Sequence, residues 1–333
     1  MQRLGNAWLY SPSDLIQFLE NEAVTWFDRF NIERPGVLLR DEESSSEQLV
    51  QAQGDEHERK FLDQLTSEHK DIVNLRGASD ASARTLDAMR GGREVIYQAH
   101  LEGDEFAGYA DFLIRVEGKS DFGGFRYEVW DTKLGRSLKP YYAVQLSCYA
   151  ELLELVQGVR PEYLGVVLGS GSHERLRTDD YFFYYKAVKQ AFLEQQRTFH
   201  PDRVPPLSGT ADYRRWTGHV TRQLEQQDDL SFIANIRTRQ IERLQANGIA
   251  TMTQLASFER AVDGIQKESL ERLQTQAKLQ LASRGLVNPT FELIPFDAEK
   301  PRLGFGGLPP SSKNDISFDI EGYPFLEDGI EYL

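Results

Sequence analysis

Two aspartates and a lysine in the middle of the chain have the spacing of a divalent-metal site. Asp111 and Asp131 each lie in an apolar, alternating run that predicts a β-strand. Lys133 follows Asp131 by two residues, so both side chains leave the same face of one strand. Two carboxylates about 4 Å apart repel by roughly 1 kcal/mol in water and about 4 kcal/mol at an intermediate dielectric. A hard cation such as Mg²⁺ converts this repulsion into binding and orders waters, one of which can attack phosphorus.

The same three residues also fit an ordinary ion pair on an edge strand beside an unrelated loop aspartate. An Asp-x-Lys spacing alone indicates no more than that, so the surrounding residues have to decide. Between residues 131 and 140, Lys133, Arg136 and Lys139 accompany a single Asp. This basic cluster suits either a solvated surface or a local contact with phosphate, because the net charge does not determine the charge at a cleft.

A histidine and a Gln–Tyr pair are the other candidate polar residues. His57, Phe61 and Leu65 recur at four-residue steps of a predicted helix, which places His57 on the buried face. A lone histidine there is commonly a core residue with a satisfied ring nitrogen. Gln145 and Tyr149 are also four residues apart on a predicted helix, so they share a face and could bind a phosphate or orient a metal site. Amphipathic helices place such pairs by chance as well.

The elements that must position these residues follow the order helix, three strands, helix, strand, helix. Ser11 and Pro12 predict a helix start, and apolar residues at helical spacing follow as far as Phe27. The other predicted elements are a helix at 46–66, a short helix within 77–92, strands at 94–101, 106–117 and 125–133, a helix at 139–157, a strand at 162–169 and a helix at 181–198. Long connections around the fourth strand predict an α/β fold with a mixed central sheet flanked by helices.

Composition and charge narrow the function classes. The chain has 333 residues, 40% of them hydrophobic and 27% charged, and this length predicts two or three domains. No apolar run reaches the roughly 18 residues of a membrane span and no signal segment is evident, so a cytoplasmic location without a membrane partner is expected. The single Cys148 excludes an internal disulfide, a cysteine zinc site and a four-cysteine iron–sulfur cluster. The net charge of −14 argues against broad, non-specific attraction to nucleic acid.

The last third of the chain predicts a small helical module followed by loops. A Pro-rich linker at 200–208 precedes short helices between 228 and 257, which contain a glycine turn at Gly248. This turn resembles that of a helix–hairpin–helix unit, whose backbone N–H groups bind phosphate, and it is equally typical of a helical packing module. Residues 315–322 predict a strand, and a second strand begins before the end of the sequence. So few residues cannot bury a core, so position 333 is interpreted as a truncation point.

Taken in order, the candidate residues resemble those of the RecB-like nucleases of the PD-(D/E)XK superfamily. The resemblance is strongest for the large prokaryotic RecB-like putative nucleases, in which a helicase portion often follows. The matching residues are His57, Asp111, Asp131, Thr132, Lys133, Gln145 and Tyr149. The resemblance implies a restriction-endonuclease-like PD-(D/E)XK core in residues 1–225, a helix–hairpin–helix-like module in 226–285, and a linker with a truncated segment in 286–333.

The resemblance implies a metal site built by four residues. Asp111 and Asp131 would ligate Mg²⁺ or Mn²⁺, and the backbone carbonyl of Thr132 would complete the ligands from the strand. His57 would be a further ligand, which reverses its interpretation as a core residue. Glu128 lies nearby in sequence, but strand alternation places it on the opposite face from Asp131, so it is not included.

The resemblance also implies catalytic roles for residues of the strand and the following helix. Lys133 would orient the attacking water and offset the charge that builds on the transition state. Gln145 and Tyr149 would hold the DNA backbone and support the site. The predicted catalytic set is therefore Asp111, Asp131, Lys133, Gln145 and Tyr149.

One departure from the family pattern concerns four cysteines that bind an iron–sulfur cluster in many relatives. The corresponding positions here are Asn21, Ala211, Arg214 and Val220, with Trp216 between the last two. Because all four cysteines are absent together, no iron–sulfur cluster is expected. Ordinary packing through Trp216 would then join the two ends of the nuclease domain.

The terminal segment resembles the first motif of an RNase H-like 3′–5′ exonuclease domain. Asp319 and Glu321 would be paired metal ligands on one strand face. The remaining acidic motifs would lie beyond residue 333, so this half-site is expected to be inert.

These observations predict a metal-dependent nuclease that hydrolyses phosphodiester bonds in DNA. The expected substrates are single-stranded DNA or DNA with free ends, in repair or recombination, within a larger protein or complex that has a helicase portion or subunit. The alternative is a non-catalytic DNA-binding or assembly module of such a protein, which the missing cysteines and the net charge of −14 favour. An enzyme that cuts RNA or branched DNA also fits the same residues.

Overall fold

A computed structural model describes residues 1–5, 7–68, 71–293, 298–299, 302, 304–317, 321–323 and 330–332. The chain divides into two compact units. The first comprises Met1–Leu207 and Ala211–Val220, and the second comprises Ser208–Thr210 and Thr221–Leu333. The first unit therefore ends a few residues before the boundary at 225 that the sequence predicted.

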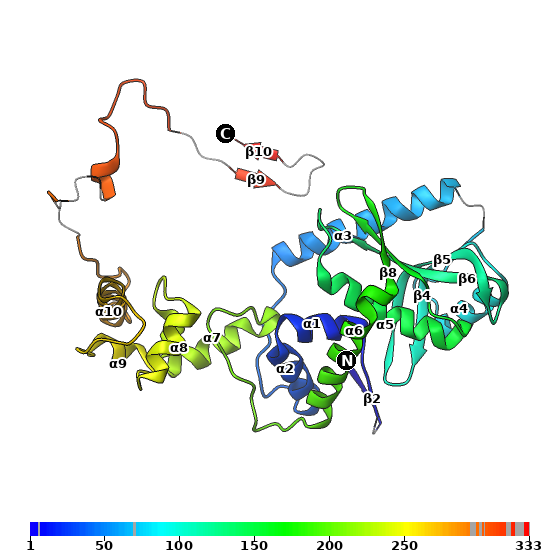
Figure 1. Cartoon of the computed structure of the whole chain (residues 1–333), viewed down its shortest axis with the longest axis horizontal. Coiled ribbons are helices and arrows are strands. Elements are labelled where there is room, and N and C mark those ends of the chain that lie inside the picture. The colour runs from blue at the N-terminus through cyan, green and yellow to red at the C-terminus, as the bar shows by residue number, and fades with distance from the viewer. Residues whose placement is uncertain are drawn as a thin grey trace. The chain divides into compact units, whose positions relative to one another are not determined.

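A mixed six-stranded sheet forms the centre of the first unit (Figure 1). Its strands, in spatial order, are β3 (Ile72–Asn74), β4 (Val95–Gly103), β5 (Phe106–Ser120), β6 (Gly123–Lys133), β7 (Tyr163–Leu168) and β8 (His173–Arg177). The β3–β4 and β6–β7 pairs are parallel, and the other neighbouring pairs are antiparallel. The predicted α/β class with a mixed sheet flanked by helices is confirmed.

Helices cover both faces of this sheet. They are α1 (Pro12–Glu20), α3 (Ser45–Glu68), α4 (Ala81–Arg90), α5 (Pro140–Gln157) and α6 (Thr178–Arg197), and α2 (Glu22–Glu33) packs against α1 and α6. Tyr127 and Val129 of β6 pack into the core on the α5 side, whereas Trp130 packs with Phe61 of α3 on the other side. Alternate residues of β6 therefore face opposite layers, as the pleat of a strand requires, and α3 and α5 lie on opposite sides of the sheet (Figure 1).

Local signals explain the helix that follows β6. Pro140 occupies the start of α5, where its missing N–H leaves no intrahelical bond unmade. Gly158 ends the helix in the left-handed region, with φ +71°, and its N–H donates to the carbonyl of Glu154. The side chain of Asp121 fills the space that a Cβ at Gly158 would occupy, so glycine is required there for two reasons.

The structure differs from the predicted elements in three places. The N-terminal helical run is two helices, because Asn21 ends α1 and then caps α2 by accepting the N–H of Ala23 at 3.0 Å. Strands β3 and β8 were not predicted: β3 is three residues long, and β8 is a mostly polar segment with Leu176 as its buried residue. A short hairpin of β1 (Gln2–Leu4) and β2 (Ala7–Leu9) was also missed.

The second unit has a small helical core of its own. Its elements include η2 (Leu230–Phe232), α8 (Thr238–Ala246), α9 (Met252–Ala256) and α10 (Lys267–Ala282), and η3 (Gly304–Gly307) lies in the C-terminal segment. The short helix η1 (Arg214–Trp216) belongs to the first unit, and α7 (Thr217–Gln226) spans the division. Gly248, at φ +78°, makes the predicted turn between α8 and α9. The N–H groups of Ala250 and Thr251 just after it donate to Oε1 of Gln254, at 2.7 and 3.2 Å. These two groups are satisfied inside the protein, and the helix–hairpin–helix function stays a prediction.

The C-terminal segment contains β9 (Glu321–Tyr323), which pairs antiparallel with β10 (Ile330–Tyr332). Residues 315–317, predicted to begin a strand, have no regular secondary structure. Asp319 lies outside the described residues, and only the backbone of Glu321 is described, so the predicted pair of acidic ligands lies outside the described part of the chain. No helix in the described ranges has the length and apolar character needed to cross a membrane.

Candidate active site

Strands β5 and β6 place Asp111 beside the segment that carries Asp131. The pairs Phe112–Trp130 and Leu113–Val129 set the register, and one step further along the antiparallel ladder Asp111 meets Asp131. Oδ2 of Asp111 accepts the backbone N–H of Thr132 at 3.1 Å and its hydroxyl at 3.3 Å.

Burial and neighbouring carboxylates together shift the pKa of Asp111. Asp131 is 4% exposed and Asp111 is half-buried. Burial, then the charge of Asp131, then that of Glu58 raise the pKa of Asp111 well above its ordinary value. The N–H of Thr132 and the charge of Lys133 act in the opposite direction and do not cancel this effect. The charged form of Asp111 is therefore disfavoured first by burial and then by repulsion from two neighbouring carboxylates.

Lys133 is held between a carboxylate and an amide. Its Nζ lies 2.6 Å from Oδ2 of Asp131 and donates to Oε1 of Gln145 at 2.9 Å. It also lies 5.5 Å from the centroid of the Tyr142 ring, a cation–π arrangement. Burial disfavours the charged form, but the carboxylates of Asp131 and Asp111 outweigh it and raise the pKa of Lys133. Lys133 is therefore a fixed cation beside Asp131 at neutral pH.

Helix α5 supports the site from behind with Gln145 and Tyr149. The side chains are 8% and 4% exposed and lie on one face, as their four-residue spacing predicted. Gln145 accepts the hydrogen bond from Lys133, and the Tyr149 hydroxyl donates to the backbone carbonyl of Tyr109 at 2.7 Å. Burial, followed by the charges of Asp131 and Asp111, raises the pKa of Tyr149 well above its ordinary value. Gln145 thus positions Lys133, and Tyr149 holds the backbone of β5 two residues before Asp111, while contact with DNA stays a prediction for both.

His57 reaches the sheet from α3 on the other side. It is half-buried, and its Nε2 lies 3.2 Å from the backbone carbonyl of Val167. A carbonyl only accepts, so the tautomer that makes this bond carries its proton on Nε2. Nδ1 then keeps a lone pair that can bind a metal ion. Val167 pairs with Thr132 across β6 and β7, so His57 lies next to the strand position of the predicted carbonyl ligand. A ring N–H fixed by a carbonyl is the usual support of a metal-binding histidine.

Sequence reasoning missed two residues, Glu58 and Gln98. Oε1 of Glu58 accepts the side-chain amide of Gln98 at 2.6 Å. Burial and a hydrogen bond with Glu58 raise the pKa of the Tyr97 hydroxyl to about 12. Gln98 has a left-handed backbone with φ +56°, and it interrupts the β4–β5 ladder at the position opposite Asp111. A signal was available in each case, since Glu58 follows His57 directly and Gln98 breaks an apolar run in β4.

The carboxylate oxygens of Asp111 and Asp131 are suitable ligands for a hard cation, although the described side chains do not form a complete coordination shell. No group of three or more His, Cys, Asp or Glu side chains is arranged to hold a metal ion among the residues that the structure describes. Asp111 and Asp131 nevertheless supply carboxylate oxygens at one position, which is what Mg²⁺ and Mn²⁺ prefer. Burial is the main reason for the raised pKa of Asp111, and the charges of Asp131 and Glu58 add to it, so a cation bound there would favour the charged carboxylate.

Comparisons with known proteins do not identify a family. No protein-family model matches the chain, and a search among curated proteins found no match. Family and activity therefore rest on the site residues and the fold that positions them.

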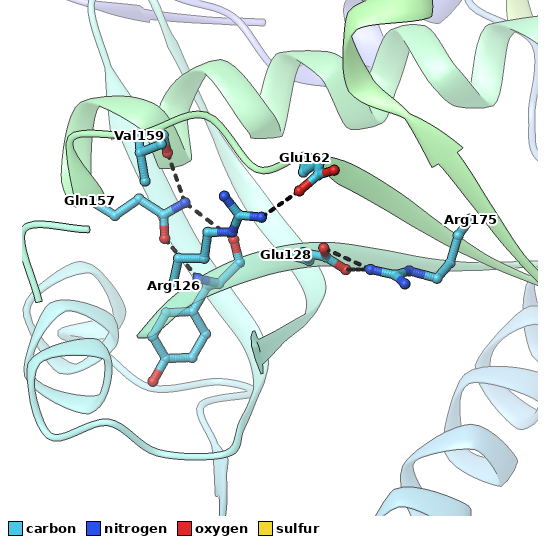
Figure 2. Close-up of polar contacts among 7 residues, drawn as sticks. Arg126, Glu128, Gln157, Val159, Glu162 and Arg175 are labelled. Carbon is cyan, nitrogen blue, oxygen red and sulfur yellow. Dashed lines mark hydrogen bonds and ion pairs between the residues drawn. The ribbon is translucent and has the colours of Figure 1, made fainter. Parts of the chain in front are cut away.

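Glu128, an acidic residue of the same strand, forms an ion pair with Arg175 instead of contributing to the site. It is 2% exposed, and both of its carboxylate oxygens lie 2.9 Å from a guanidinium nitrogen of Arg175 on β8. Figure 2 shows this pair beside a second ion pair, Arg126 with Glu162, at 2.8 Å. Burial raises the pKa of Glu128, and the hydrogen bond with Arg175 only partly offsets it. Its exclusion from the site agrees with these contacts.

Side-chain contacts join the two ends of the first unit near Asn21 and Arg214, two of the positions that the resemblance aligned with cluster cysteines. The Trp216 ring stacks on Phe27 with centroids 5.7 Å apart and 30° between the planes. Its Nε1 donates to Asp28 at 3.0 Å, and Nδ2 of Asn21 donates to the carbonyl of Asp212 at 2.9 Å. The predicted packing contact through Trp216 is confirmed, while the absence of an iron–sulfur cluster stays a prediction.

Proposed function

We propose that this chain is a RecB-like nuclease of the PD-(D/E)XK superfamily, with a restriction-endonuclease-like core, that hydrolyses DNA phosphodiester bonds with Mg²⁺ or Mn²⁺. The observation that carries the proposal is the grouping of Asp111, Asp131 and Lys133 at adjacent positions of β5 and β6. His57 approaches the same strands from α3, so all four predicted side chains come from elements in contact with β6 or β7.

Each residue has a definite part in the proposed reaction. Asp111, Asp131, the carbonyl of Thr132 and Nδ1 of His57 would hold the cation, which would supply Lewis-acid activation of a water and of the phosphate. Lys133, a cation held by Gln145, orients the attacking water and stabilises the extra negative charge of the transition state. Asp131 fixes the position of the Lys133 ammonium, which otherwise has a flexible four-carbon stem.

The wider context belongs to the same proposal. The substrate is DNA that is single-stranded or has free ends, and the reaction serves repair or recombination in the cytoplasm. The chain acts as part of a helicase–nuclease, with no iron–sulfur cluster in the nuclease core. Residues 226–285 form a helix–hairpin–helix-like module, and Asp319 with Glu321 begin an RNase H-like exonuclease domain.

One observation favours the alternative, a non-catalytic DNA-binding or assembly module. Lys133 binds Asp131 directly, and an ammonium in that place can balance the buried carboxylate without a metal ion. Titration of the full chain with Mn²⁺ in a calorimeter separates the two functions. A nuclease should bind Mn²⁺ stoichiometrically and lose that binding in Asp131→Asn, whereas a scaffold should show no stoichiometric binding at this site.

Cleavage assays test the proposal directly. The full chain is incubated with labelled single-stranded DNA, duplex DNA, flap DNA and RNA in the presence of Mg²⁺ or Mn²⁺. Lys133→Met and Asp131→Asn should each lower the cleavage rate by about 100-fold or more, the usual effect of removing a preorganised charge from an active site. Glu128→Gln is the matched control, because Glu128 lies on the same strand but faces Arg175. Equal cleavage by wild type and Lys133→Met would refute the proposal, as would no cleavage of any substrate by wild type.

A further inference from the structure

Tyr109 is an exposed aromatic side chain next to the proposed metal site. It lies on β5 two residues before Asp111 and is 49% exposed, whereas Tyr97, Phe112 and Tyr127 of the same sheet are at most 2% exposed. Residues in a strand rise about 3.3 Å each, so the Cα atoms of Tyr109 and Asp111 are about 7 Å apart. A nucleotide adjacent to a phosphate bound at Asp111 therefore lies within reach of the Tyr109 ring.

The structure fixes Tyr109 in place from two sides. Its backbone carbonyl accepts the Tyr149 hydroxyl at 2.7 Å, and its ring packs edge-on against His100, with centroids 4.8 Å apart. His100 is its partner across β4 and β5, and the N–H of His100 donates to Oγ1 of Thr85 in α4 at 3.0 Å. An aromatic side chain that is already fixed loses little conformational freedom when a ligand stacks on it.

Net charge explains why such a contact would be needed. Proteins usually gain most of their affinity for nucleic acid from phosphate neutralisation by lysine and arginine. This chain has 38 such residues against 52 acidic ones, so its overall charge attracts DNA weakly and phosphate contacts depend on local groups such as Lys133, Arg136 and Lys139. Stacking of a base on an aromatic ring does not depend on net charge and tolerates any base. A base is available for such stacking only where it is unpaired.

We infer that Tyr109 stacks on an unpaired nucleobase beside the scissile phosphate, which makes single-stranded DNA or a frayed end the preferred substrate. This inference rests on the proposed nuclease function and adds the residue, Tyr109, that would select the single-stranded substrate. Tyr109 is in this view a specificity-determining residue, and the catalytic residues remain those of β5 and β6.

Binding of a fluorescent oligonucleotide tests the inference in the full chain. Lys133→Met serves as the background, so that DNA binds with Mg²⁺ without being cut. Single strands carry 2-aminopurine at successive positions, and stacking on Tyr109 should quench the fluorescence at one position. Adding Tyr109→Leu should remove that quench and weaken binding by about 5- to 150-fold, the range for loss of one base–aromatic stack. Tyr109→Phe keeps the ring and should bind within about twofold of the background.

Tyr184→Leu is the matched control, because Tyr184 is 54% exposed on α6 and belongs to no proposed contact. Cleavage by the enzyme with an intact Lys133 supplies the second measurement. There, Tyr109→Leu should lower kcat/KM on single-stranded DNA and leave that on duplex DNA nearly unchanged. The inference is overturned, while the nuclease function stands, if wild type cleaves DNA but no 2-aminopurine position is quenched. It is also overturned if Tyr109→Leu lowers kcat/KM equally on single-stranded and duplex DNA. If wild type neither binds nor cleaves DNA, the nuclease function itself fails.

Discussion

The side-chain amide of Gln98 donates a 2.6 Å hydrogen bond to Glu58 and so ties β4 to α3 at the strand position opposite Asp111. Gln98 adopts a left-handed backbone conformation, with φ +56°, that ordinary side chains rarely occupy. Such strain costs on the order of 1–3 kcal/mol and persists where surrounding contacts hold it, often at functional sites. Here the held geometry keeps a third carboxylate, Glu58, close enough to raise the pKa of Asp111 after burial and Asp131.

Gln98→Gly should separate stability from activity. Glycine relieves the left-handed strain, so the melting temperature should stay the same or rise, but the hydrogen bond with Glu58 is lost. We expect metal-dependent cleavage to fall by about 10- to 100-fold, the size of effect known for residues around a metal site that are not ligands themselves, because Gln98 holds the carboxylate of Glu58 near Asp111. Thermal unfolding and a cleavage assay over a range of Mn²⁺ concentrations measure the two effects.

Asp104→Gly is the matched control for this variant. Asp104 also has a left-handed backbone, with φ +51°, but it lies in the β4–β5 turn away from Glu58. It should gain stability in the same way without loss of cleavage. Unchanged cleavage by Gln98→Gly would show that the Gln98–Glu58 hydrogen bond does not serve the site.

Trp216 should be a main source of stability for the first unit. The ring is 1% exposed, stacks on Phe27 and donates to Asp28. Trp216→Ala should lower the free energy of unfolding by about 3–5 kcal/mol through the cavity it leaves. Trp216→Phe keeps a ring but removes the donor to Asp28, a carboxyl whose pKa burial already raises, and should cost about 1–3 kcal/mol.

Urea denaturation monitored by far-UV circular dichroism, which does not need a tryptophan signal, measures this effect. Phe183→Ala is the control, because Phe183 is 83% exposed and its removal should change the free energy of unfolding by less than about 0.5 kcal/mol. Equal stabilities of Trp216→Ala and Phe183→Ala would mean that the two ends are joined by other contacts.

Glu151 should make stability depend on acidic pH. Burial disfavours its charged form, but hydrogen bonds from Lys186, Lys189 and Tyr185 outweigh burial and lower the pKa of Glu151 from 4.5 to about 2. Because the folded pKa is depressed, the contribution is fully present above about pH 4.5 and is lost as pH falls toward 2. One pKa unit corresponds to about 1.4 kcal/mol. Because Lys186 is 48% exposed, solvent screening reduces the contribution of Glu151 to the free energy of unfolding to about 2 kcal/mol.

Comparison of wild type with Glu151→Gln measures this contribution. The difference in their free energies of unfolding should be largest at pH 6 to 7 and should shrink steadily below about pH 4.5. Glu154→Gln, on the same helix, removes only the ion pair with Arg160, whose carboxylate is more exposed. It should change the free energy of unfolding by about 0–1 kcal/mol. A difference for Glu151→Gln that does not change with pH would contradict the assigned pKa.

The sequence alone determined the order of the main elements and the residues with the chemistry of the site. Period-two runs placed Asp111 and Asp131 on strands, and four-residue spacing placed Gln145 with Tyr149 and His57 with Phe61 on helix faces, because side-chain direction in a regular element follows from local periodicity. Alternation along β6 also separated Glu128 from Asp131. These are properties of neighbours in sequence, and they need no knowledge of distant contacts.

Only the tertiary structure decided which groups meet across elements. Short or polar strands such as β3 and β8 are held by pairing with a longer neighbour, so their own residues give little signal. The hydrogen bond between Gln98 and Glu58 joins residues 40 positions apart and depends on one strained φ angle, which no pattern in the sequence specifies. The exposure of Tyr109 likewise follows from which parts of the sheet the helices leave uncovered, a result of packing rather than of periodicity.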